Sequence, residues 1–411
     1  MSDTRIRHVE YDWLRVLALG LLFIFHSAMG FSSWPWHVKD AHHSWLLDLI
    51  LDFLLRWRIA LVFIVSGAAL MFALRVRTPA AILRERSQRL LIPLIFGMLV
   101  IVPPQVYLER VQRHQFRGSF LDYLPHFADG LYPDGNLSWH HLCFIPYVLV
   151  LTVAAMPLFA WAQSPQGLRR LEPIVRATIR HRLYWLLFVP LALAQLAIHT
   201  QGNDDHTFVT DLHGWIQFTT LMLLGGALAL WRPLLEAIQR ERYVALAVGI
   251  LAYIALIDEW NSADLDPVTL PFFNAVAYCG LSGVNVLAWV LAATAFLTHW
   301  FNRPSPILTY ATEAAMPVYM LHQTLIVFAV YQLGHEHWPL PIKLVITFSF
   351  ALLGSLALYE LAIRRSSVLR MLFGVKPRAR QIGAEVLLPD NQTARATSRW
   401  RARFSSDRRP S

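Results

Sequence analysis

Charged residues and cysteines are both scarce in this chain of 411 residues. Asp, Glu, Lys and Arg together make up 15% of it, whereas apolar residues make up 56%. This balance excludes an ordinary water-soluble globule and favours an integral membrane protein. The only two cysteines, Cys143 and Cys279, lie in apolar stretches. They predict neither a disulfide framework nor a cysteine-based zinc site.

Two further features are missing from the sequence. No small-residue cleavage site follows the first apolar run, so we expect that run to act as an uncleaved signal anchor. No internal repeat is evident, which weakens the case for a transporter built from inverted repeats. The net charge of +9 comes with positive residues in alternate loops and in the tail, as membrane topology requires. We therefore expect membrane lipids as partners and no nucleic acid.

Ten apolar runs are present in the chain. A helix needs about 20 residues to cross the ~30 Å hydrocarbon core of a bilayer, so the shorter runs have uncertain boundaries. The sequence predicts an all-α polytopic membrane protein with about ten transmembrane helices. The runs span approximately residues 13–31, 47–74, 90–104, 138–161, 183–198, 214–231, 244–257, 272–300, 316–333 and 342–361.

Loop charges predict the orientation of these helices. The segments before the first run and after every second run are rich in arginine, and by the positive-inside rule they face the cytoplasm. Both termini are then cytoplasmic. Residues 376–411 are basic and poor in apolar residues, which is typical of a disordered cytoplasmic tail.

The first apolar run holds two ionisable residues, Arg15 and His26, eleven positions apart. At about 100° per residue they lie within roughly 20° of one another on the helix, separated by roughly 16 Å along its axis. Ionisable groups inside a membrane are costly and commonly line functional cavities. The alternative interpretation is that Arg15 reaches toward lipid phosphates while His26 hydrogen-bonds a neighbouring helix. Asp12, three positions before Arg15, is a candidate ion-pair partner.

Candidate site residues also occur in the second and ninth runs. Arg58 lies in the outer part of the second run, and Ser66 lies deeper, beside Gly67, which favours close helix packing. Tyr319 and His322, three apart in the ninth run, share a helix face. Each of these side chains can serve in positioning or in hydrogen bonding.

Arginines and histidines in the loops suggest two further points. Arg86 and Arg89 share one face at the entrance to the third run, where guanidinium groups suit the phosphates of a donor substrate; a purely topological role is the alternative. The histidines of the predicted outer loops show no metal-ligand spacing, so we predict no metal site. These are His37, His42, His43, His335 and His337.

Four motifs, taken together and in order, resemble the membrane acyltransferase family 3. They are Arg-x10-His at Arg15 and His26, Phe-x-x-Ser-Gly at residues 63–67, Arg-x-x-Arg at Arg86 and Arg89, and Tyr-x-x-His at Tyr319 and His322. The resemblance covers roughly residues 8–375. Within the family the chain is most similar to the branch of periplasmic-glucan succinyltransferases, through segments such as RWRIALVFIVSG. It departs from the usual pattern at Cys143, where the family commonly has tryptophan.

The resemblance implies an integral membrane O-acyltransferase with a ten-helix domain over residues 8–375. An acetyl or succinyl group would move from a cytoplasmic acyl-coenzyme A donor, which is a substrate and not a bound cofactor, to a hydroxyl of an extracytoplasmic carbohydrate. His26 would be the general base or a covalent acyl carrier, Arg15 would orient the donor, and Arg86 and Arg89 would bind its phosphates.

Two other classes of function remain open from the residues alone. A secondary transporter or exporter of sugars or anionic solutes would use the same intramembrane charges as a substrate path. A non-catalytic membrane subunit would tolerate substitution of Arg15 and His26. The sequence leaves the acyl group, the acceptor and the oligomeric state undetermined.

Overall fold

The structure is a computed structural model that describes residues 8–201, 208–261 and 271–376. All of the named secondary-structure elements in these ranges are helices. The α-helices are α1 (Val9–Met29), α2 (Trp45–Leu74), α3 (Pro79–Arg86), α4 (Ile92–Phe96), α5 (Pro103–Gln112), α6 (Phe120–Tyr123), α7 (Phe144–Gln163), α8 (Pro165–Arg180), α9 (Phe188–Gln201), α10 (Leu212–Leu230), α11 (Arg232–Arg240), α12 (Arg242–Asn261), α13 (Phe272–Trp300), α14 (Pro306–Leu333), α15 (Leu340–Leu358) and α16 (Ser367–Leu372).

The predicted all-α class is confirmed, and each of the ten apolar runs is helical. Eight helical segments of the described residues are long and apolar enough to span a membrane. The fifth run, in α9, follows α8 across a bend of 97°, and the seventh run, in α12, is a shorter apolar helix. The chain is a multi-pass membrane protein, while the count of ten and the cytoplasmic termini stay predictions. The tail from residue 377 onward and residues 1–7 lie outside the described part.

The third span is much longer than the apolar run that predicted it. It is helical from Pro79 to Gln112 and includes two π-helical turns, Ser87–Leu91 and Gly97–Ile101. The predicted apolar run, residues 90–104, covers only the middle of this span, because the charged and polar residues 84–89 interrupt the apolar signal near its start. Arg86 and Arg89 therefore lie within a continuous helix, and the outer connection begins only after Gln112.

Glycines fix how closely the helices approach each other. A Cβ atom on Gly67 of α2 would overlap the carbonyl oxygen of Met222 of α10, and one on Gly225 of α10 would overlap that of Ile64. These contacts confirm the expected close packing at Gly67. In α13, Gly283 packs against the backbone of α9 at Phe188. α13 is continuous through this close contact.

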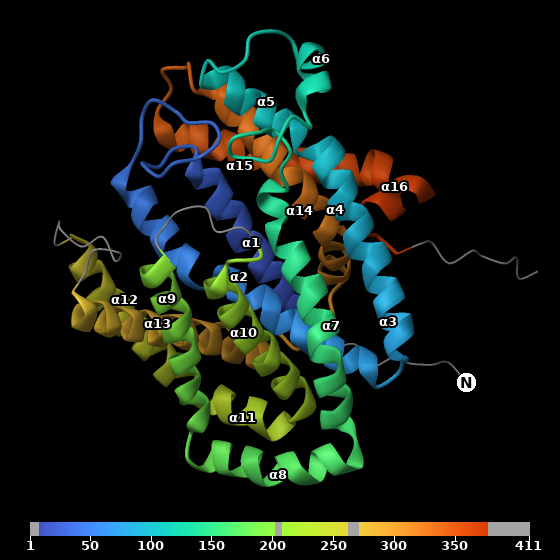
Figure 1. Cartoon of the computed structure of the whole chain (residues 1–411), viewed down its shortest axis with the longest axis vertical. Coiled ribbons are helices and arrows are strands. Elements are labelled where there is room, and N and C mark those ends of the chain that lie inside the picture. Colours follow the sequence, from blue (N-terminus) through green and yellow to red (C-terminus); the bar gives the residue numbers. More distant parts are fainter. Residues whose placement is uncertain (1–7, 202–207, 262–270, 377–411) are drawn as a thin grey trace, which may run out of the picture. The chain divides into compact units, whose positions relative to one another are not determined.

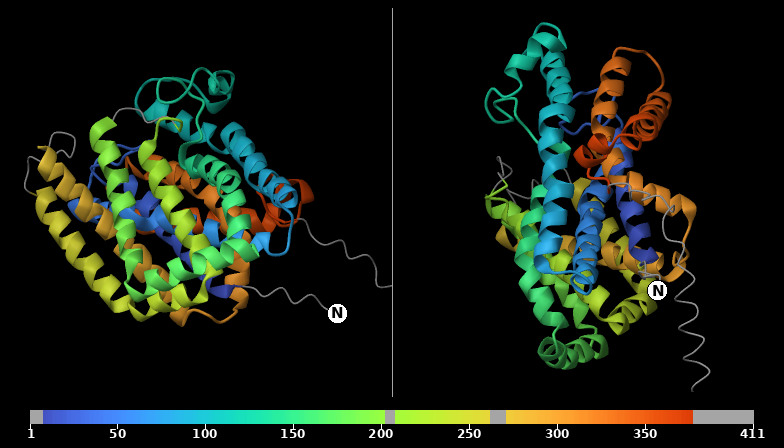
Figure 2. Two further views of the ribbon diagram at one scale, coloured as in Figure 1. Left: turned by 60° about the horizontal axis from the view of Figure 1, so that its bottom comes forward. Right: turned by 90° about the vertical axis from the view of Figure 1, so that its right-hand side faces the viewer.

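Buried apolar residues form two clusters, each of which includes one end of α1 and one end of α2. One cluster packs α2, α7, α10 and α13, and the other packs the end of α1 against α4, α5, α14 and α15. Figures 1 and 2 place α5 and α6 at one end of the described helices and α8 at the other. His26, near the end of α1, contacts Phe25 of the second cluster, and Phe23 of the same cluster contacts His322.

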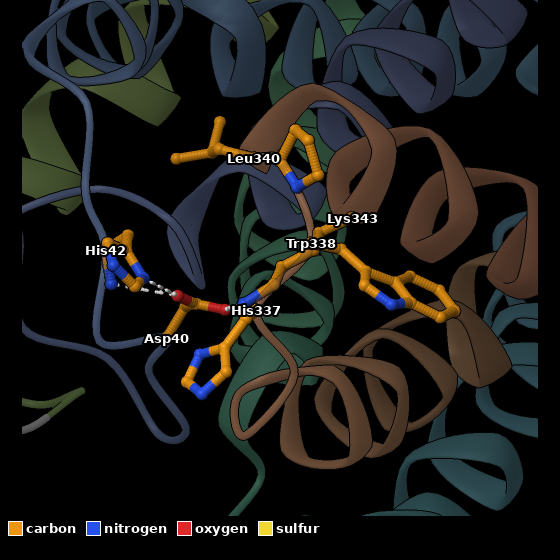
Figure 3. A pocket seen from close by; sticks show the side chains of 7 residues that line it. Asp40, His42, His337, Trp338, Leu340 and Lys343 are labelled. Atoms are coloured by element: carbon orange, nitrogen blue, oxygen red, sulfur yellow. Dashed lines mark hydrogen bonds and ion pairs between the residues drawn. The ribbon is translucent and has the colours of Figure 1, made fainter.

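A buried ion pair ties the α1–α2 connection to α15. Lys343 Nζ lies 2.5 Å from Asp40 Oδ2, and each side chain is 1% exposed. The backbone N–H of His42 donates to the other oxygen of Asp40 at 2.8 Å. A cavity of about 350 Å³ lies over this pair and is also lined by His337, as Figure 3 shows. Since breaking a buried pair costs about 3–5 kcal/mol, the contact holds the α1–α2 connection in place.

Candidate active site

Two imidazoles meet in the apolar interior between α1 and α14. His26 Nδ1 lies 2.7 Å from His322 Nε2, and the two rings are nearly parallel, with an interplanar angle of 14°. His26 is 9% exposed and His322 is fully buried. The packing of α1 against α14 therefore brings His26, from the first apolar run, into contact with His322, from the ninth.

The hydrogen bonds determine which nitrogens of this pair carry protons. His322 Nδ1 lies 2.6 Å from the carbonyl oxygen of Tyr319, which can only accept, so His322 Nδ1 donates. In neutral His322 the Nε2 atom is then an acceptor, and His26 Nδ1 must donate to it. The remaining nitrogen of neutral His26, Nε2, keeps a free lone pair. A nitrogen in that state can accept a proton or attack a carbonyl carbon.

Tyr319 and His141 also contact His322. The Tyr319 hydroxyl donates to the carbonyl oxygen of His141, and His141 Nε2 hydrogen-bonds the carbonyl oxygen of Met320 at 3.0 Å. The His141 ring also meets the His322 ring edge-on, with centroids 5.2 Å apart. Tyr319 thus acts on His322 through the backbone, and its hydroxyl joins α14 to the segment before α7.

Arg58 is a buried cation beside these imidazoles. Its side chain is 4% exposed in α2, and its Cζ atom lies 3.2 Å from the ring centroid of Phe25. Its Nε and Nη1 atoms are buried and have no hydrogen-bond partner among the described residues, and its charge acts on His26. Arg56, two residues earlier, instead pairs with both oxygens of Asp52 at 2.9 and 3.0 Å.

The other predicted arginines form a separate basic group. Arg86 lies within electrostatic range of Arg15 and Arg89, and it makes no hydrogen bond or ion pair with the described residues. Arg89 donates to the carbonyl oxygen of Gly374 at 3.0 Å and lies 3.4 Å from Glu85. Arg15 thus groups with the predicted phosphate-binding arginines of the third span.

Asp12 and Ser66 complete the set of predicted residues. Asp12 lies 3.7 Å from Arg15, so the expected i, i+3 ion pair is present. Ser66 is half-buried in α2, and within the described residues none of the hydrogen bonds of His26 or His322 involves it. The structure therefore places Asp12 with the basic group and leaves Ser66 outside the hydrogen-bonded imidazole pair.

A third polar group was not found from the sequence. His37, from the α1–α2 connection, lies 2.7 Å from Glu109 of α5, and its ring stacks on His140 with centroids 4.1 Å apart. Burial and the neighbouring Glu109 carboxylate raise the pKa of Tyr132 to about 12, so its hydroxyl stays protonated and donates to Glu109. No sequence motif predicts the group of His37, Glu109 and His140, because these residues come from three segments without common spacing.

Comparison with known families identifies the class of protein. A family model described as an acyltransferase domain matches residues 8–360, which is most of the chain. The chain belongs to acyltransferase family 3. The residues that suggested this family, including Arg15 and His26, lie within the matched range. This membership establishes the protein as a membrane acyltransferase and favours the enzyme over the transporter and non-catalytic alternatives.

Two of the similar curated proteins share one name. Glucans biosynthesis protein C from Salmonella paratyphi B and from Salmonella enteritidis PT4 are each 26% identical to this acyltransferase over 393 residues. The aligned region covers 90% of this chain and 94% of each relative. No solved structure gives a significant match.

We predict that His322 positions His26 in this acyltransferase. Substituting His322→Phe removes the acceptor for His26 Nδ1 and should lower kcat by up to about 10²-fold, since a displacement near 1 Å has effects of that size. His322→Gln, whose amide oxygen can accept the same proton, should retain more activity. The measurement is steady-state acyl transfer over a range of pH.

The pH profile separates positioning from a general loss of structure. The acidic limb reports protonation of the base, so it should move in His322→Phe. It should stay in place in the control His126→Phe, which changes an exposed imidazole. Equal activity and an unchanged profile in His322→Phe would contradict the assignment.

Proposed function

We propose that this acyltransferase moves an acetyl or succinyl group from cytoplasmic acyl-coenzyme A to a hydroxyl of an extracytoplasmic carbohydrate. The observation that carries the proposal is the hydrogen-bonded pair His26–His322, which leaves His26 Nε2 with a free lone pair. A neutral imidazole can act as a general base at working pH, because the ordinary pKa of histidine is about 6.5.

The proposed reaction is an attack on a thioester. The acceptor hydroxyl gives its proton to His26 Nε2 while its oxygen bonds to the acyl carbonyl carbon. The carbon–sulfur bond then breaks, and the proton passes from His26 to the leaving thiolate. The products are an ester and free coenzyme A thiol. In the covalent variant His26 Nε2 first takes the acyl group, releases the thiol and then passes the group to the hydroxyl.

The arginines of the third span supply a site for the donor. Arg86 makes no hydrogen bond or ion pair with the described residues, so its donors are available to a phosphate, and Arg15 and Arg89 add positive charge. Guanidinium groups bind phosphates through charge-assisted and often bidentate hydrogen bonds. Acyl-coenzyme A carries several phosphates on the side remote from the thioester, which suits a basic group set apart from His26.

Arg58 supplies positive charge where the acyl group reacts. Its guanidinium has buried donors without partners in the part of the chain that the structure describes, and its charge acts on His26. A cation held in an apolar region stabilises negative charge that develops on a carbonyl oxygen during acyl transfer. It would also attract an acyl group with a carboxylate end, such as succinyl.

The acceptor side is proposed from the relatives and from the distribution of charge. The relatives are named for glucan biosynthesis, which supports a glucan hydroxyl as the acceptor. α8 carries several arginines and lies at the opposite end of the described helices from α5 and α6, as Figure 2 shows. This distribution supports cytoplasmic termini, a location in the bacterial inner membrane, and an outer side formed by α5 and α6.

Replacing the proposed base tests the reaction itself. His26→Ala should lower acyl transfer by at least about 10²-fold, because the hydroxyl proton loses its acceptor. The assay follows free thiol released from acetyl- or succinyl-coenzyme A, with acyl-glucan detected by mass spectrometry, using purified protein in liposomes. Wild-type rates of both products in His26→Ala would overturn the role of His26. Movement of intact solute without thiol release would instead indicate a transporter.

Donor binding is tested by comparing two arginines of α3. Arg86→Ala should raise the KM for acyl-coenzyme A by roughly 10- to 100-fold, the value of one or two charged hydrogen bonds. Arg84→Ala, which removes an exposed guanidinium two residues earlier, should leave KM unchanged. Equal effects of the two substitutions would show a general electrostatic influence of the segment and no specific phosphate contact.

Substitutions of Arg58 and Arg56, two residues apart on α2, should shift Tm in opposite directions. Arg58→Met removes a buried charge without a carboxylate partner, so it should raise Tm in detergent while lowering kcat by about 10²- to 10³-fold. Arg56→Met leaves Asp52 without its partner and should lower Tm. Thermal unfolding and acyl-transfer rates are measured on the same preparations. A fall in Tm for Arg58→Met, or full activity, would contradict the proposed role.

A further inference from the structure

Three potential metal ligands converge near α5 from separate parts of the chain. One ligand atom from each of His37, Glu109 and His140 lies within 4.8 Å of the other two. His37 comes from the α1–α2 connection, Glu109 from α5 and His140 from the turn before α7. Two donor atoms on one ion at ~2.0–2.2 Å lie at most about 4.4 Å apart, so small side-chain rotations would close this group on a metal.

One ligand atom of the group lacks a partner. His140 Nε2 is buried and makes no hydrogen bond within the described residues. The other ring nitrogen, Nδ1, lies 2.7 Å from the Ser138 hydroxyl oxygen. If Nδ1 donates to Ser138, Nε2 carries a lone pair, which is the state a metal ligand needs. Histidines that bind metals commonly donate their second N–H to a neighbouring oxygen in this way.

Glu109 is oriented by contacts to one of its two oxygens. Its side chain is fully buried, and Oε1 accepts from the Tyr132 hydroxyl at 3.0 Å and lies 2.9 Å from Arg113 Nη1. Oε2 faces His37 Nδ1 at 2.7 Å. The carboxylate is thus fixed through Oε1, while Oε2 is directed toward the two imidazoles.

From these contacts we propose that His37, Glu109 and His140 bind one divalent zinc-class metal ion. Two imidazoles and one carboxylate suit Zn²⁺, which then keeps a fourth position for water or another ligand, whereas Mg²⁺ and Ca²⁺ prefer oxygen ligands alone. The ion joins the α1–α2 connection, α5 and the segment before α7. His140 is adjacent to His141, whose ring contacts that of His322. The ion therefore lies on the same side of the His26–His322 pair as His141. The site does not depend on the proposed acyl donor or acceptor.

The test measures metal binding directly on the full chain in detergent. After treatment with a chelator and its removal, Zn²⁺ is titrated in competition with a chromophoric zinc chelator, and metal content is measured by mass spectrometry. We expect one Zn²⁺ per chain, no displacement by millimolar Mg²⁺, and a rise in Tm. His140→Ala and Glu109→Gln should weaken binding by at least about 10²-fold, because each removes a ligand and loss of an outer-shell contact alone costs 10- to 100-fold.

Two controls make the result decisive. His42→Ala removes a largely exposed imidazole of the same connection and should leave zinc affinity unchanged. Ser138→Ala keeps all three ligands and should weaken binding by about 10- to 100-fold, so the proposal remains testable even where a ligand variant fails to fold. Absence of saturable Zn²⁺ binding in the wild type would overturn the proposal. The proposal would also be overturned if Ser138→Ala left the zinc affinity unchanged while His42→Ala and His140→Ala lowered it equally.

Discussion

The hydrogen bond between His26 and His322 is the contact on which the proposed chemistry of this acyltransferase depends. In an apolar interior a polar group without a partner is costly, so each imidazole nitrogen has a defined role. The carbonyl oxygen of Tyr319 fixes the proton on His322, and His322 in turn fixes the proton on His26. The direction of this chain of hydrogen bonds leaves His26 Nε2 as the free base. The same logic applies wherever an imidazole is oriented by a second group before it takes a proton.

Charge is distributed in two distinct ways around this pair. The neighbouring cation, Arg58, lies over Phe25 and keeps buried donors free, whereas Arg56 on the same helix is neutralised by Asp52. Farther along, Arg15 and Arg86 form part of a basic group of their own. A protein that retains an unpaired buried cation gives up stability at that position, which is typical of residues kept for function. The separation of the two groups suits the proposed donor, whose phosphates lie far from its reactive thioester.

The side of the molecule near α5 is held together by polar contacts between segments that are distant in sequence. The ion pair of Asp40 with Lys343 fixes the α1–α2 connection to α15, and His37 of the same connection reaches Glu109 on α5. A bound metal would add a third tie at His140. If the acceptor binds on this side, as proposed, the rigidity that these contacts provide would serve its orientation.

The sequence by itself determined the class of fold and the family, because long apolar runs can only be helices in a membrane and the motifs around Arg15, His26, Arg86 and His322 follow one order. It located only the middle of the third span, since charged and polar residues near the start of that span interrupt the apolar signal. Only the tertiary structure decided that His26 and His322, 296 residues apart, share a hydrogen bond. It also decided that Arg58 lacks the carboxylate that Arg56 has, and that His37 meets Glu109. Such pairings depend on which helix faces pack together, and local spacing along one chain carries no information about that.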